Sequence, residues 1–270
     1  MERGARSRGV RLLTNKIYNV DCIEGMKELY EEHGECIDLC VTDPPYGIDY
    51  QSNGSLKKKS KLVNDDIPNY KTFGGLVYKL LKPNSHAYFF TRFDVYPEHH
   101  KQLTEVGFNI KNLIVAEKMQ AGGLGDLKGS FANNIEMVIF AHKGRRIFNK
   151  TKLIKNEKPA GKRLNRYANP TNEYKTRFPV LWKVSDGYPP AVLNSSQNKG
   201  NPHPTPKNPK FLEWLLQLSS DVGDVVIDPF IGGGSLAEAC VNTGRNYIGY
   251  ELDESFYNYA NERISNLLVN

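Results

Sequence analysis

The sequence predicts an α/β protein: a doubly wound, mostly parallel sheet with helices on both faces and a small irregular insert. Three observations support this class. Strand and helix signals alternate over residues 16–144 and again over 202–270, polar sequence rich in proline and glycine separates them, and acids or glycines follow several buried strands. Such alternation favours a parallel sheet covered by helices. A chain of 270 residues is long enough to bury a sizeable core.

The first stretch contains strands that read as short apolar runs and helices that show apolar residues on one face. Ile23, Met26, Leu29 and Tyr30 share such a face, and Pro83 ends a later helix because proline cannot continue it. We expect strands at 16–20, 37–42, 87–91, 112–117 and 136–141, and helices at 23–30, 70–81 and 98–106.

The last stretch repeats this alternation at shorter spacing. We expect helices at 209–219, 235–243 and 255–268, and strands at 224–228 and 246–251. The chain then divides into a flexible basic arm or expression-tag remnant (1–15), two halves of one α/β domain (16–144 and 202–270), and an irregular region between them (145–201).

The irregular region begins within a run of positive charge. Residues 143–183 contain thirteen lysines and arginines against two glutamates. Such a segment favours a polyanionic partner, although a solvated surface that keeps the protein soluble is the simpler alternative. A smaller cluster, Lys57, Lys58 and Lys59, lies in a polar loop. The candidates for contacts with a polyanion are Lys57, Lys58, Lys59, Arg163, Arg166 and Arg177, although the lysine cluster alone would more often be a solvated loop than a binding site.

A glycine-rich turn follows one of the late strands, in the sequence DPFIGGGS from Asp228 to Ser235. Glycines permit positive φ and close backbone approach, and the helix that starts near Ser235 offers free amides to a ligand. About twenty residues later another strand ends at Glu251, where an acid can accept both hydroxyls of a ribose. A tight structural turn is the alternative. The dinucleotide and P-loop patterns are absent, so the turn suits S-adenosylmethionine.

An acid, two prolines and a tyrosine follow the buried run 37–42, in TDPPYG. Pro44 and Pro45 have no N–H and fix φ, so the Asp43 carboxylate and the Pro44 carbonyl present only acceptors. An exocyclic amine is the natural guest for such a site, and Tyr46 offers a surface for stacking its base. The alternative is a proline-rich turn that merely ends a strand.

Taken together, TDPPYG, HPTPK (His203 to Lys207) and DPFIGGGS resemble the β class of amino-group DNA methyltransferases, in which these motifs occur in this order. Asn208 and GGGS depart from the usual HPTQKP and GSGT. The resemblance implies a circularly permuted S-adenosylmethionine-dependent methyltransferase fold, with 145–201 as the target-recognition region. The implied catalytic residues are Asp43, Pro44, Pro45 and Tyr46. The implied cofactor-binding residues are Asp21, Cys22, Asp43, Lys207, Asp228, Phe230, Gly232, Gly234, Ser235 and Glu251, with Asp21 and Cys22 at the adenine ring and Lys207 at the methionine carboxylate.

The resemblance further implies transfer of a methyl group to N6 of an adenine flipped out of double-stranded DNA. N4 of cytosine, an RNA or protein amide acceptor, and a non-catalytic nucleic-acid binder are the alternatives. A second copy of the chain and a cognate restriction endonuclease are candidate partners. No apolar run approaches a membrane span, no secretory signal precedes the domain, and the four cysteines lack zinc spacing, so we expect a cytoplasmic protein without metal.

Overall fold

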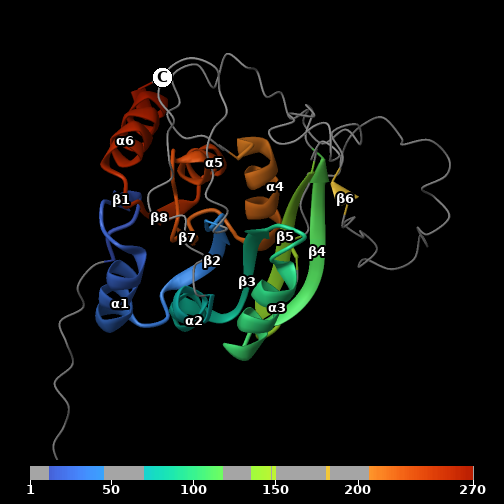
Figure 1. Cartoon of the computed structure of the whole chain (residues 1–270). Helices are drawn as coiled ribbons and strands as arrows, with labels where there is room; N and C mark the ends of the chain where they lie inside the picture. The colour runs from blue at the N-terminus through green and yellow to red at the C-terminus, as the bar shows by residue number, and fades with distance from the viewer. Residues whose placement is uncertain are drawn as a thin grey trace, which may run out of the picture.

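The computed structural model describes residues 12–45, 70–117, 135–146, 148–149, 181–182 and 207–269, with only the backbone of 117 and 181–182. In these ranges the chain forms one sheet flanked by helices (Figure 1). The strands are β1 (Lys16–Tyr18), β2 (Ile37–Thr42), β3 (Leu81–Thr91), β4 (Asn109–Glu117), β5 (Ile135–Lys143), β6 (Leu181–Trp182), β7 (Val225–Asp228) and β8 (Asn246–Tyr250). The helices are α1 (Cys22–His33), α2 (Tyr70–Leu80), α3 (Tyr96–Glu105), α4 (Pro209–Ser219), α5 (Ser235–Thr243) and α6 (Glu254–Val269).

The eight-stranded sheet has the order β1-β8-β7-β2-β3-β5-β4-β6. Every neighbouring pair is parallel except the two pairs that contain β5. The two late strands β7 and β8 lie between β1 and β2, so both halves of the chain build the same sheet. This arrangement confirms the predicted doubly wound, mostly parallel fold.

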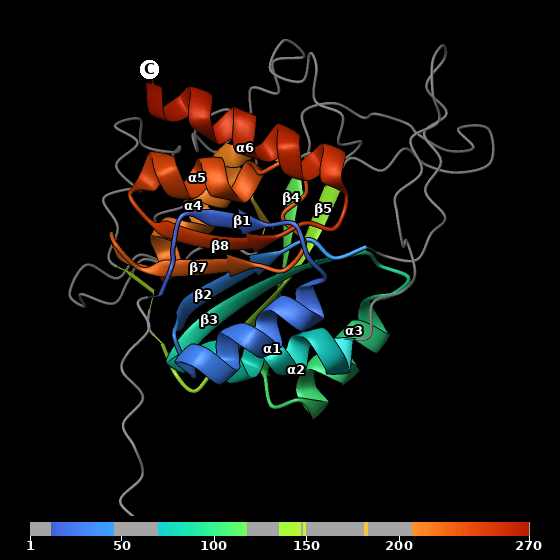
Figure 2. The ribbon, with the colours of Figure 1, turned by 90° about the vertical axis from the view of Figure 1, so that its left-hand side faces the viewer.

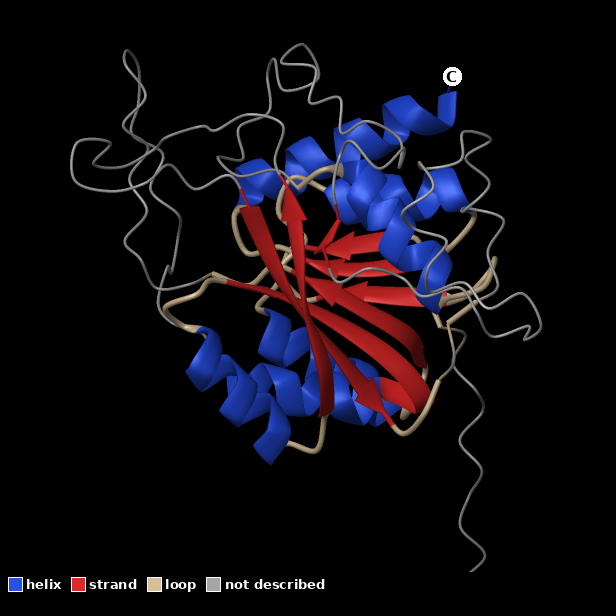
Figure 3. Ribbon diagram, turned by 90° about the vertical axis from the view of Figure 1, so that its right-hand side faces the viewer, coloured by secondary structure: helices blue, strands red, loops and turns tan. Residues whose placement is uncertain are grey.

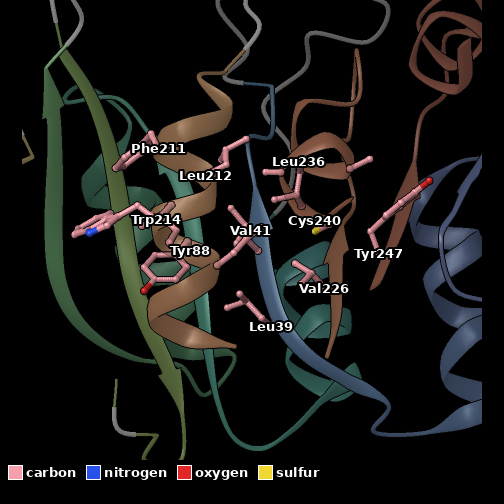
Figure 4. Close-up of a cluster of buried hydrophobic side chains, with 14 of the residues drawn as sticks. Leu39, Val41, Tyr88, Phe211, Leu212, Trp214, Val226, Leu236, Cys240 and Tyr247 are labelled. Atoms are coloured by element: carbon pink, nitrogen blue, oxygen red, sulfur yellow. The ribbon is translucent and has the colours of Figure 1, made fainter. Parts of the chain in front are cut away.

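Helices cover both faces of the sheet, with α1, α2 and α3 on one side and α4, α5 and α6 on the other (Figures 2 and 3). Successive side chains along each strand point to opposite faces of the sheet, so the strands contribute to two hydrophobic cores, one on each face. In β3, Tyr88 and Phe90 pack toward α4, while Ala87 and Phe89 pack toward α2. Figure 4 shows the first core, in which side chains of β2, β3 and β7 meet those of α4 and α5.

Strand β3 begins at Leu81, whereas the sequence predicted a strand from Ala87. Leu81 pairs with Ile37, and the register between β2 and β3 then shifts before His86 pairs with Leu39. This irregularity accommodates Pro83 and the positive φ of 62° at Asn84. Most other predicted elements differ from the observed ones by only a few residues at their ends.

None of the helices in the described ranges combines the length and the apolar character that crossing a membrane requires. All four cysteines are free thiols. Within the same ranges, no three His, Cys, Asp or Glu side chains are grouped so that they could hold a metal ion.

Candidate active site

The two strand ends that carry the sequence motifs lie side by side. Strands β2 and β7 pair in parallel, with Leu39 opposite Val226 and Cys40 opposite Ile227. Beyond this ladder, Thr42 Oγ1 donates a 2.7 Å hydrogen bond to Asp228 Oδ1. The DPP segment that follows β2 and the glycine turn that follows β7 therefore meet at the carboxyl edge of the sheet, where open α/β sheets bind ligands.

The glycine turn has the backbone conformation that its sequence predicted. Gly232 and Gly234 have φ values of 52° and 79°, and α5 starts directly after Gly234. A Cβ on Gly234 would lie 3.0 Å from Ala260 Cβ and 3.3 Å from Ala260 Cα. Because Gly234 is the N-cap and has no side chain, the turn brings backbone amides close to the pocket.

Asp228 fixes the start of this turn. Its Oδ1 accepts the Phe230 amide at 3.0 Å in addition to the Thr42 hydroxyl. Burial raises the pKa of Asp228 to about 7, although both hydrogen bonds act in the opposite direction. Phe230 then packs edge-to-face on Phe73 of α2, with ring centroids 5.2 Å apart.

Glu251 follows β8, the neighbour of β7. Its amide donates to the Tyr18 carbonyl at 3.0 Å, and its Oε1 accepts the Asp253 amide at 2.7 Å. Burial raises the pKa of this carboxyl group. The Ile231 amide donates to the Tyr250 carbonyl at 3.0 Å and so joins the glycine turn to the strand end that precedes Glu251.

Asp43 forms an ion pair across the pocket with Lys207, whose Nζ lies 2.6 Å from Asp43 Oδ2. A second carboxylate oxygen, Glu136 Oε2, lies 3.5 Å from the same Nζ. Burial alone would lower the pKa of Lys207, but Asp43 and Glu136 together outweigh burial and raise it. Lys207 directly precedes Asn208, the N-cap of α4, whose side chain accepts the Lys210 amide at 2.9 Å. The departure from the family pattern at Asn208 thus serves as a helix cap.

One pocket lies between Asp43, Lys207, Asp228 and the glycine turn, and its empty space, including the part open to solvent, is about 440 Å³. The lining residues come from β2, β3, α4, the glycine turn and α5: Val41, Thr42, Asp43, Phe90, Lys207, Leu212, Asp228, Phe230, Ile231, Gly232, Gly233, Ser235 and Leu236. The glycine turn and the acceptors fit a nucleoside cofactor with an amino-acid tail.

Comparison with known proteins assigns the family. The DNA methylase family that comprises N6 and N4 methyltransferases matches residues 37–262. The chain belongs to this family. Methylases of this family use S-adenosylmethionine.

Two curated relatives cover most of the methylase. Type II methyltransferase M.HpaI of Haemophilus parainfluenzae is 28% identical over 251 residues, which is 90% of this chain and 73% of the relative. Type II methyltransferase M1.MboII of Moraxella bovis is 26% identical over 270 residues, with 95% and 98% covered.

Solved structures show the same fold. The M1.HpyAVI–SAM complex superimposes with a TM-score of 0.64 at 22% identity and covers 92% of this chain and 98% of its own. The PvuII DNA methyltransferase, named cytosine-N4-specific, gives 0.63 at 16% identity, with 92% and 85% covered.

Asp21 and Cys22 lie at the carboxyl end of β1, beside β8, and the pocket lining described above includes neither of them nor Glu251. Asp21 is the N-cap of α1, and its Oδ1 accepts the Ile23 amide at 2.8 Å. Cys22 is buried, and burial raises the pKa of its thiol. The side chain of Asn19 donates to the Glu251 carbonyl at 2.8 Å and so ties this turn to the end of β8.

Several predicted site residues lie outside the described ranges: Tyr46, Lys57, Lys58, Lys59, Arg163, Arg166 and Arg177. Within the ranges, the pocket gains Thr42, Phe90 and Leu212, and Glu136 contacts Lys207; sequence reasoning named none of them. Thr42 carries a usable signal, because it is a polar residue at the end of a buried strand. Glu136 carries no such signal, because its place depends on the reversed direction of β5.

Proposed function

We propose that this DNA methylase transfers a methyl group from S-adenosylmethionine to the exocyclic N6 of an adenine flipped out of double-stranded DNA. The observation that carries the proposal is the single pocket lined by Asp43 and by the glycine turn. In that pocket the acceptors for an amine and the amides for a cofactor lie at neighbouring strand ends. Flipping is needed because a paired base hides its amine inside the stack.

One group of residues binds and orients the cofactor. The amides at the glycine turn and the start of α5, around Gly232, Gly234 and Ser235, approach the tail and ribose, with Phe230 beside them and Asp228 holding the turn. Glu251 accepts the ribose hydroxyls, and Asp21 with Cys22 flanks the adenine ring. Lys207 can hold the methionine carboxylate, as the family pattern implies, although its contact in the structure is with Asp43. When bound, S-adenosylmethionine supplies a methyl group that its positive sulfur makes electrophilic.

The catalytic side presents acceptors to the amine. The Asp43 carboxylate and the Pro44 carbonyl accept its two N–H groups, which turns the nitrogen lone pair toward the methyl group, and Tyr46 stacks on the base. The amine nitrogen forms the new N–C bond while the S–C bond breaks. The electron pair of the S–C bond goes to sulfur. Positive charge grows on the amine, is stabilised by Asp43, and disappears when one proton leaves.

Adenine is preferred over cytosine because aspartate is associated with N6-adenine enzymes at the first position of this motif and serine with N4-cytosine enzymes. N4 of cytosine is the second candidate, since a fold neighbour is named cytosine-N4-specific and both bases carry an amine beside a ring nitrogen. Incubating DNA with labelled cofactor, digesting it to nucleosides and identifying the labelled species decides between them.

Target recognition and partners complete the proposal. The basic region 145–201 contacts DNA, with Arg163, Arg166 and Arg177 on phosphates or base edges and Lys57, Lys58 and Lys59 on phosphates. A homodimer and a cognate restriction endonuclease are proposed partners. M.HpaI is named a type II methyltransferase, whereas another relative, M.BamHII of Bacillus amyloliquefaciens, is named an orphan methyltransferase. Methylating the genome of a host that lacks the enzyme and sequencing single molecules would reveal the target site.

A further inference from the structure

Two carboxylates share one buried ammonium at the pocket. Lys207 Nζ lies 2.6 Å from Asp43 Oδ2 and 3.5 Å from Glu136 Oε2. The side chains of Lys207, Asp43 and Glu136 are only 13%, 19% and 24% exposed. The ring of Phe90 lies against the same ammonium, with its centroid 5.2 Å from Nζ. In such a screened place, charges act on one another more strongly than at the surface.

The three groups come from separate elements, and the backbone fixes each of them. Asp43 follows β2, Lys207 precedes α4, and Glu136 is near the start of β5. Because β5 is antiparallel to β3, the first residues of β5 lie at the edge of the sheet where β2 and β3 end. Glu136 also pairs with Ala116 of β4, so its carboxylate stands on a strand paired on both sides.

Two carboxylates in this group face one ammonium. If Lys207 paired with Asp43 alone, its ammonium would neutralise the Asp43 carboxylate, which is the acceptor on which the proposed transfer depends. An acceptor that keeps negative charge stabilises the positive charge growing on the attacked amine.

We propose that Glu136 is a positioning residue for methyl transfer. Its carboxylate attracts the Lys207 ammonium, which then neutralises less of the charge on Asp43, so Asp43 remains a strong acceptor. This inference rests on the proposed function. Glu136 acts through Lys207, because its effect depends on the contact between the Glu136 carboxylate and the Lys207 ammonium.

The first test is Glu136→Gln, which keeps the shape of the side chain and removes its charge. We expect kcat to fall roughly tenfold, the size of one charge-assisted interaction. Glu136→Asp should recover part of the loss.

A matched control lies at the opposite end of β5. Glu35 Oε1 is 2.7 Å from Nζ of Lys143, which is 12% exposed, so this pair also joins a carboxylate to a buried lysine. Glu35→Gln should leave kcat unchanged. Equal kcat losses in Glu136→Gln and Glu35→Gln would contradict the proposal.

The second test shows whether Glu136 acts through Lys207. It measures ligand binding and needs no turnover. Sinefungin carries an amine where the transferable group sits, and S-adenosylhomocysteine does not, so the ratio of their affinities reports the charge facing that position. Calorimetry should show that Glu136→Gln weakens sinefungin roughly tenfold relative to S-adenosylhomocysteine. In a Lys207→Met background the same substitution should leave the ratio unchanged.

An unchanged ratio in Glu136→Gln alone, or the same tenfold change with Lys207 already removed, would overturn the inference. Failure of the proposed function looks different, because the wild-type protein would then bind neither compound and label no DNA.

Discussion

Thr42 Oγ1 donates a 2.7 Å hydrogen bond to Asp228 Oδ1, and the two residues stand 186 positions apart in the chain. Thr42 ends β2 just before the DPP segment, and Asp228 ends β7 just before the glycine turn. This bond joins the strand ends that precede the DPP segment and the glycine turn, and holds both at one pocket.

The first prediction concerns this bond. Thr42→Val removes the donor and leaves the buried Asp228 carboxyl with one fewer partner, so the free energy of unfolding should fall by roughly 1–3 kcal/mol. Urea unfolding measures the loss. Thr42→Ser keeps the hydroxyl and deletes one methyl group, which should cost only about 1 kcal/mol. A Thr42→Val protein as stable as the wild type would contradict the role given to the bond.

The second prediction concerns pH. Burial raises the pKa of Asp228 in the folded protein from its usual value of 3.8 to about 7. Between these values the unfolded chain has lost the proton that the folded chain retains, so Asp228 lowers stability as pH rises from about 4 to about 7 and adds no further change above that. Relative to Asp228→Asn, the wild-type protein should therefore lose stability over this window. Parallel curves of unfolding free energy against pH for the two proteins would refute it.

The third prediction concerns the glycine turn. Gly234→Ala forces an L side chain to φ 79° and places its Cβ 3.0 Å from Ala260 Cβ. Stability should fall by roughly 1–2 kcal/mol or more, and affinity for S-adenosylhomocysteine should fall as well. Gly244→Ala is the control, because Gly244 has φ 72°, its added Cβ would lie 3.2 Å from Val222 Cγ1, and neither residue lines the pocket. It should lose stability but keep its affinity for the ligand, as calorimetry would show; equal affinity losses in both variants would count against the turn as a binding element.

The fourth prediction concerns Glu251. Glu251→Gln removes the charge proposed to accept the ribose hydroxyls, so affinity for S-adenosylhomocysteine should fall roughly 10- to 100-fold. Glu254→Gln changes an exposed acid in the first turn of α6 and should leave the affinity unaltered. If calorimetry finds both variants equal to the wild type, Glu251 does not bind the ribose.

Sequence reasoning worked where local signals were strong. The bounds of β2 were predicted because an apolar run ends at an acid and two prolines, and those of α4 also agree with the predicted range 209–219. Asp43 follows β2 and Asp228 ends β7, and the parallel pairing of these two strands brings both acids to the same edge of the sheet.

What was missed depends on long-range geometry. The early part of β3 contains Pro83 and Asn84, which locally oppose a strand, and pairing with Ile37 is possible only because the register shifts. Glu136 reaches Lys207 because β5 is antiparallel to β3, a direction that the residues of β5 do not encode.

The most direct test of the central claim is methyl transfer by Asp43→Ala, measured with labelled cofactor on DNA that is afterwards digested to nucleosides. The wild-type enzyme should label N6-methyladenine. Asp43→Ala should keep its affinity for S-adenosylhomocysteine and lose transfer by roughly 100-fold or more, since it lacks the acceptor for the amine. Near-normal transfer by Asp43→Ala would contradict the account.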